Sequence, residues 1–147
     1  MLCMDMMELR RMVMAQMAGS NAIKGTITPD SVGTVTINFG KTLNKYLWFL
    51  EMTDASKTSL LASGINLVKA YANIGAYPMP GISSDTPSKG YFTYRVNPST
   101  QAYTTSTYNY DCATSTGLTF GTCEASTNYA NYLYVGYTYN YTIIPID

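Results

Sequence analysis

The residue types that most often perform chemistry in proteins are scarce in this chain. Histidine is absent from all 147 residues, which excludes nucleophile activation by Ser-His-Asp or Cys-His and removes the commonest zinc ligand. The three cysteines, Cys3, Cys112 and Cys123, form no Cys-x-x-Cys pair and are too few for a four-thiolate metal site. The Gly-Lys-Thr at residues 40–42 lacks the preceding glycine of a phosphate-binding loop and is interpreted as a turn.

A pair of carboxylates is the remaining arrangement that could act as acid and base, as glycoside hydrolysis requires. Most acidic residues lie in expected turns, but Glu51 lies in an apolar segment and could be buried. Asp111 and Glu124 flank the segment between the last two cysteines and would be close if its ends pair, which makes them the one candidate dyad or calcium site. We expect a non-enzymatic protein without metal or cofactor.

Cys112 and Cys123 leave two interpretations open. They bracket a Gly/Thr-rich segment that could form a hairpin, so the thiols could meet across two strands and form a disulfide outside the cell. Two reduced, half-buried thiols are equally compatible with the sequence.

The charge balance argues against nucleic acid and membrane partners. Nine basic and nine acidic residues cancel, without the basic excess of a nucleic-acid-binding protein. No run reaches the roughly 18 apolar residues of a membrane-spanning helix, and Asp5 and Glu8 interrupt any secretory signal. We therefore expect a soluble chain made in the cytoplasm, with 46% hydrophobic residues to build the core of one domain.

Residues 131–146 carry the strongest structural pattern. Apolar and aromatic residues occupy every second position and Gly, Thr or Asn lie between them, which predicts one long strand in the middle of a sheet. The alternating residues are Leu133, Val135, Tyr137, Tyr139, Tyr141 and Ile143.

Other strands are expected at intervals of roughly ten residues. The segments 23–28 and 34–39, separated by a Pro-Asp-Ser turn, predict a hairpin, and the apolar run 46–52 predicts a central strand buried on both faces. Residues 53–59 are expected to form a polar loop. Further strand candidates are 64–73, 90–96, 101–111 and a short one within 112–123. About eight strands indicate an all-β fold, a β-sandwich or jelly-roll-like domain over residues 21–147.

Two kinds of aromatic residue could bind a ligand. Trp48 is interpreted most simply as a core residue of segment 46–52, with an exposed sugar-stacking platform as the alternative. Most of the fourteen tyrosines lie after residue 90, where they form either a polar β surface or a binding face. In the second case Tyr103, Tyr108 and Tyr110, with Trp48, are the candidate glycan contacts.

Residues 1–20 differ from the rest, because residues 4–18 are good helix formers. Leu2, Met6, Leu9, Val13 and Gln16 follow a coiled-coil-like spacing over about two heptads, too short for a stable isolated helix. The helix could cap its own sheet, or it could mediate attachment or oligomerisation. In that second case Met6, Leu9, Val13 and Met17 are the expected contacts.

Four stretches of the chain are residues 8–17 (ELRRMVMAQM), residues 24–29 (KGTITP), residues 33–50 (GTVTINFGKTLNKYLWFL) and the ending GYTYNYTIIPI. Together they resemble small bacteriophage virion proteins of the tail-fibre, baseplate or head-fibre type. In that family a short N-terminal α-helix leads into a β-sandwich. The resemblance implies a non-enzymatic structural protein located in the virion, assembled as a homo-oligomer, often a trimer, with other virion proteins as partners and a host-surface glycan as a further ligand. A free-standing carbohydrate- or receptor-binding module is the alternative function.

Overall fold

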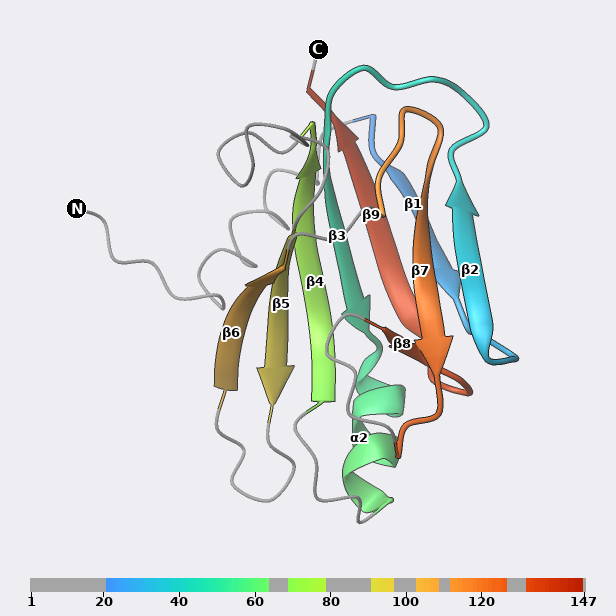
Figure 1. The fold of residues 1–147 in the computed structure, drawn as a ribbon, viewed down its shortest axis with the longest axis vertical. Coiled ribbons are helices and arrows are strands. Elements are labelled where there is room, and N and C mark those ends of the chain that lie inside the picture. The colour runs from blue at the N-terminus through green and yellow to red at the C-terminus, as the bar shows by residue number, and fades with distance from the viewer. Residues whose placement is uncertain are drawn as a thin grey trace, which may run out of the picture.

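Two β-sheets that share one hydrophobic core make up most of the described protein (Figure 1). In a computed structural model, the placed residues are 21–63, 69–78, 91–96, 103–108, 112–126 and 132–146. The expectation of an all-β fold built from two sheets is confirmed. The N-terminal helix expected at residues 4–18 lies outside the described residues.

The larger sheet has six strands, all antiparallel to their neighbours, in the order β1-β9-β3-β4-β5-β6. Its strands are β1 (Ile23–Ile27), β9 (Tyr139–Pro145), β3 (Tyr46–Met52), β4 (Lys69–Tyr77), β5 (Tyr91–Val96) and β6 (Tyr103–Tyr108). β3 lies between β9 and β4, and Trp48 on one face and Phe49 on the other are both buried. The prediction of a central strand at residues 46–52 is therefore confirmed.

The smaller sheet has three strands in the order β2-β7-β8. They are β2 (Gly33–Asn38), β7 (Gly117–Cys123) and β8 (Leu133–Tyr134). β2 pairs antiparallel with β7, and β7 pairs parallel with β8. The chain just before β7 also folds back on it, because Ala113 bridges Leu118 and the Thr119 amide donates to the Cys112 carbonyl at 2.8 Å.

The hairpin expected from residues 23–39 is wrong. β1 pairs with β9 in the larger sheet, whereas β2 pairs with β7 in the smaller one. The chain changes sheets at the turn that follows β1, and Pro29 is buried there. The alternating patterns of both strands identified a buried face correctly, but they do not specify the neighbouring strand. Here the two strands belong to opposite layers of the sandwich (Figure 1).

The single long strand expected at residues 131–146 is also wrong in its extent. The chain turns at Val135 and Gly136, where Gly136 has a φ of +85° that favours glycine, and its amide donates to the Pro29 carbonyl at 2.9 Å. As a result β8 lies in the smaller sheet and β9 in the larger one. β9 retains the predicted interior position, between β1 and β3.

A helix, α2 (Asp54–Ala62), replaces the polar loop expected after residue 52. Thr53 caps its N-terminus, where its side chain accepts a hydrogen bond from the Ser56 amide, and Asp54 lies favourably in the first turn. Leu60 is fully buried in the core, so the helix covers one end of the sandwich (Figure 1). In the described part of the chain, no helix has both the length and the apolar character needed to cross a membrane.

Aromatic side chains join the two sheets in the core. The rings of Trp48 in β3 and Phe120 in β7 meet edge to face, with centroids 5.5 Å apart. Tyr46 contacts Phe39, which follows β2, in the same geometry at 5.0 Å, and stacks on Tyr77 of β4 at 5.2 Å. Such pairs add roughly 0.5–1.5 kcal/mol each beyond the area they bury. The core thus fixes how the sheets face one another.

Candidate functional site

Of the two carboxylates that could form an acid–base pair or a metal site, the structure describes only Glu124. Glu124 is exposed just after β7, and Asp111 lies outside the described residues. Among the described residues, no three side chains of the metal-binding types His, Cys, Asp and Glu form a group that could hold an ion. A dyad of Asp111 and Glu124 therefore stays a prediction from the sequence.

The disulfide considered for Cys112 and Cys123 is not formed. Both residues are described, and both are buried thiols. The strand register explains the result, since Cys112 lies opposite Thr119, four residues before Cys123 on β7. Four residues of strand span roughly 13 Å, whereas the Cα atoms of a disulfide lie within about 7 Å of each other. The hairpin exists, but its turn is too close to Cys112 to bring the two cysteines together.

The structure describes three of the four candidate glycan contacts. Trp48 is 1% exposed and packs against Phe120, so its indole is a core group and cannot stack on an external sugar. Tyr103 and Tyr108 are the first and last residues of β6, at the edge of the larger sheet, in register with Val96 and Tyr91. Tyr110 lies outside the described residues, as do the attachment residues Met6, Leu9, Val13 and Met17.

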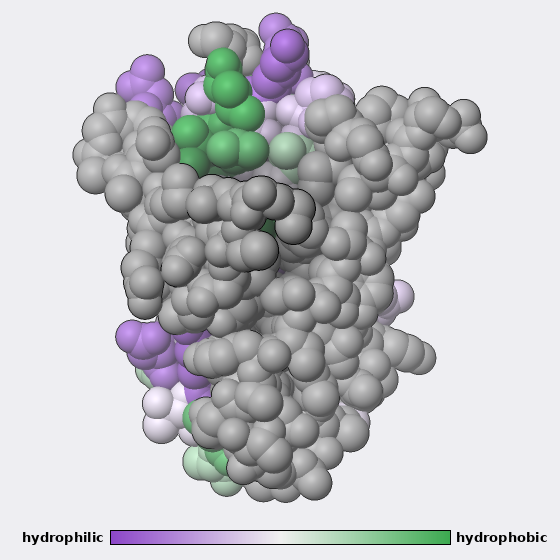
Figure 2. All heavy atoms as spheres, turned by 90° about the vertical axis from the view of Figure 1, so that its left-hand side faces the viewer, coloured by the Kyte–Doolittle hydropathy of each residue, from purple (hydrophilic) through white to green (hydrophobic). Residues whose placement is uncertain are grey.

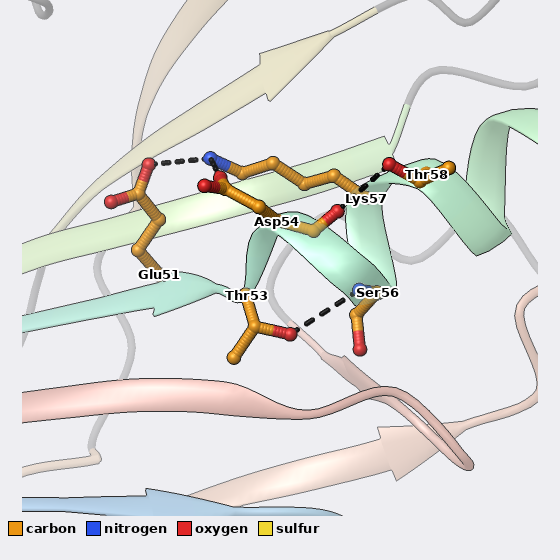
Figure 3. A network of polar contacts seen from close by, with 6 residues as sticks. All are labelled: Glu51, Thr53, Asp54, Ser56, Lys57 and Thr58. Carbon is orange, nitrogen blue, oxygen red and sulfur yellow. Dashed lines mark hydrogen bonds and ion pairs between the residues drawn. The ribbon is translucent and has the colours of Figure 1, made fainter.

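Charged side chains meet where α2 follows β3 (Figure 3). Lys57 of α2 donates to Oε1 of Glu51 at 2.7 Å, and its Nζ lies 3.9 Å from Oδ1 of Asp54. The Glu51 and Lys57 side chains are only 11% and 22% exposed, whereas Asp54 is in open solvent. The buried Glu51 foreseen as an exception thus pairs with Lys57. This pair fixes the helix against the end of β3.

Hydrogen bonds connect the same corner to Thr138, the residue just before β9. The Thr53 amide donates to the Thr138 carbonyl at 2.9 Å, and the Thr138 amide donates to Oγ of Ser56 at 2.8 Å. Sequence reasoning missed this cluster because it read residues 53–59 as a loop. The signal was present, since a threonine followed by aspartate is a common start of a helix.

Two buried tyrosines hydrogen-bond across the core. The Tyr46 hydroxyl donates to the Thr114 carbonyl at 2.7 Å, and the Tyr139 hydroxyl accepts from the Tyr134 amide at 3.0 Å. Burial raises the pKa of both phenols well above the ordinary tyrosine value. They therefore stay neutral at physiological pH, so they act as donor and acceptor in the core and do not serve as bases.

The exposed surface offers neutral polar and apolar groups. On the outer face of the smaller sheet, Thr36 and Thr119 lie side by side with their Oγ1 atoms 3.0 Å apart. Leu47 and Ile146 are 39% and 51% exposed where β3 begins and β9 ends. Figure 2 shows hydrophobic surface at that end of the molecule, next to hydrophilic groups. This surface can contact other molecules.

No family model, no curated protein and no solved structure matches this chain.

Proposed function

We propose that the protein is a non-enzymatic structural component of a bacteriophage virion, in which copies of the chain assemble with one another and with other virion proteins. The main support for this proposal is where the polar side chains lie and what they contact. The Glu51–Lys57 pair and the hydroxyls of Tyr46 and Tyr139 connect elements of the fold. Apart from Lys24 of β1, the polar residues that the described strands expose are mainly uncharged threonine and asparagine. Such a surface suits lasting contacts between subunits, because little charge has to be desolvated when it is covered.

In this proposal the N-terminal segment carries the attachment. Residues 1–20 would form a helix that joins copies of the chain, often as a trimer, or attaches them to the particle, with Met6, Leu9, Val13 and Met17 as contacts. Methionine suits such a contact because its flexible side chain adapts to varied apolar surfaces. The β domain would then be displayed outward.

The proposal is tested on particles. Where the gene is carried by a phage or prophage, virions are purified on a density gradient and their proteins quantified by mass spectrometry. We expect the chain in the particle fraction at a fixed copy number relative to the major capsid protein. A chain found in the infected-cell lysate but absent from washed particles would contradict the proposal. An abundant cytoplasmic host protein, measured in the same fractions, reports carry-over.

A further inference from the structure

β2 is an edge strand that lacks the usual protection. It ends the smaller sheet, and within the described residues nothing pairs with its other side. Natural edge strands are commonly very short, charged, bulged or interrupted by proline, so that they do not pair with other chains. β2 has six residues, Gly-Thr-Val-Thr-Ile-Asn, with no charge and no proline, and its register with β7 is unbroken.

The backbone groups on the open side of β2 can be identified from one hydrogen bond. The Phe39 amide donates to the carbonyl of Thr116, the residue opposite it, at 3.0 Å. Because the direction of the backbone groups alternates along an antiparallel strand, the groups of Val35 and Ile37 also point to β7. Those of Thr34, Thr36 and Asn38 therefore point away from the sheet. All three of these residues are exposed.

We propose that the open edge of β2 pairs antiparallel with β2 of a second copy of this chain, around a two-fold axis at Thr36. Thr36 would face its own counterpart, and Thr34 would face Asn38 of the other copy. These are all hydrogen-bonded positions, so three residue pairs give roughly six backbone hydrogen bonds. The three-stranded sheets of two copies would become one continuous six-stranded sheet.

The side chains favour a second copy over an unrelated strand. The sequence from Thr34 to Asn38 alternates polar and apolar residues symmetrically about Thr36. In the two-fold register, Val35 therefore lies opposite Ile37 on the core side, and threonine or asparagine lies opposite threonine on the outer side. Val35 is only half-buried in the single chain, so the pairing covers it further. A two-fold contact requires a surface that is complementary to itself, and the segment from Thr34 to Asn38 meets this requirement.

Of the other three described edges, β8 and β1 fit the proposal less well, whereas β6 (Tyr103–Tyr108) also has six residues without charge or proline. β8, at the opposite end of the smaller sheet, has only two residues. β1, at the edge of the larger sheet, carries the exposed Lys24, which would disfavour an uncharged partner strand.

Cysteine cross-linking tests the register. In Thr36→Cys the two new thiols would lie on directly opposed residues, whose Cα atoms are about 5.5 Å apart, within the range of a disulfide. In the control Thr34→Cys they would be separated by roughly 13 Å of strand. Both variants carry Cys3→Ser, are oxidised mildly and are run on non-reducing gels. We expect a covalent dimer for Thr36→Cys and little for Thr34→Cys. Equal cross-linking of the two, or none in Thr36→Cys, would overturn the proposal.

Light scattering on the full chain gives a second measurement. Thr36→Lys places two like charges opposite each other at the axis, and Thr26→Lys adds the same charge to an exposed position of β1. We expect Thr36→Lys to lower the concentration-dependent mass and Thr26→Lys to leave it unchanged, with equal melting temperatures. If Thr36→Lys retains the wild-type mass, the edge is not the contact, and a β2 edge that captures a different protein becomes the better explanation.

The outcome is independent of the virion proposal. The pairing rests on strand geometry, so a chain that forms the Thr36 dimer but is absent from purified particles would contradict the proposed function alone.

Discussion

At the scale of single residues, Gly75 of β4 lies close against the indole of Trp48 in β3. The two residues are opposite each other in the sheet, and a β-carbon at position 75 would overlap the indole atoms Cε2, Cζ2 and Nε1. A glycine at position 75 therefore leaves the space that the indole of Trp48 occupies. This also accounts for the burial of Trp48, which sequence patterns alone could not decide.

We expect Gly75→Ala to destabilise the fold by about 1–3 kcal/mol, the usual cost of overpacking a core. Trp48→Phe removes the atoms that would overlap, so the double variant should be less destabilised than the sum of the two single variants. Urea unfolding of the four proteins measures this coupling. Strict additivity would mean that the two side chains do not share the same space.

The Tyr139 hydroxyl satisfies a buried amide. Tyr139→Phe leaves the Tyr134 amide without this acceptor in a fully buried site, and we expect a loss of about 1–3 kcal/mol in the free energy of unfolding. Tyr141→Phe, two residues along the same strand and less buried, is the matched control and should change stability by under about 0.5 kcal/mol. Similar losses in both variants would show that the hydrogen bond is not the cause.

The same tyrosines predict a loss of stability in alkali. Burial raises the folded-state pKa of Tyr46 and Tyr139 above the ordinary value of 10.0, so at high pH the unfolded chain releases protons that the folded chain retains. Their contribution is fully present below about pH 10 and is lost as the pH rises further, by up to about 1.4 kcal/mol per pH unit for each tyrosine. Urea unfolding between pH 8 and 11 should show this decline, and Tyr139→Phe should make it shallower. An unchanged slope in Tyr139→Phe would contradict the assignment.

Among the elements, α2 depends most on a specific polar contact. The Lys57–Glu51 pair is largely buried, so removing one partner leaves a charge with poorer solvation. We expect Lys57→Met to cost about 1–3 kcal/mol, and Glu51→Gln combined with Lys57→Met to recover part of the loss. Asp54→Asn is the control, since that carboxylate is fully exposed and 3.9 Å away. Thermal unfolding of these variants shows whether the loss of stability comes from the Lys57–Glu51 pair or from any change of charge on the surface of α2.

The helix and strands also show which structural features could be predicted from the sequence. β3 has the predicted bounds of 46–52, because a continuous apolar run bounded by polar residues has few other solutions in a sheet protein. α2 was missed because its one fully buried residue, Leu60, gives almost no helical periodicity. Its cap at Thr53 was the better signal. Local patterns therefore succeeded where burial was continuous and failed where a single contact positions the helix.

For the whole molecule, the all-β class followed from the sequence but the pairing of strands did not. Alternation in β1 and β2 shows which side chains face the core. It does not show that β1 pairs with β9 from the other end of the chain, or that Gly136 ends one strand and moves the next into the other sheet. Those choices depend on contacts between distant segments. The candidate site was predicted least well, because the burial of Trp48 and the separation of Cys112 from Cys123 depend on this topology.

The division of the chain at residue 20 gives the last prediction. The described core cluster is built from residues 37–143, and the described ladders begin at Ile23. Deleting residues 1–19 should therefore leave a β domain that unfolds cooperatively, while its mass falls to the dimer or monomer that the β2 edge alone supports. The control is the full chain with Leu9→Lys and Val13→Lys, which should lose the same assembly if those residues are the contact. If the truncated chain is unfolded by circular dichroism, the N-terminal segment belongs to the core and its role in attachment is wrong. If it folds and keeps the full-length mass, assembly depends on the β domain alone.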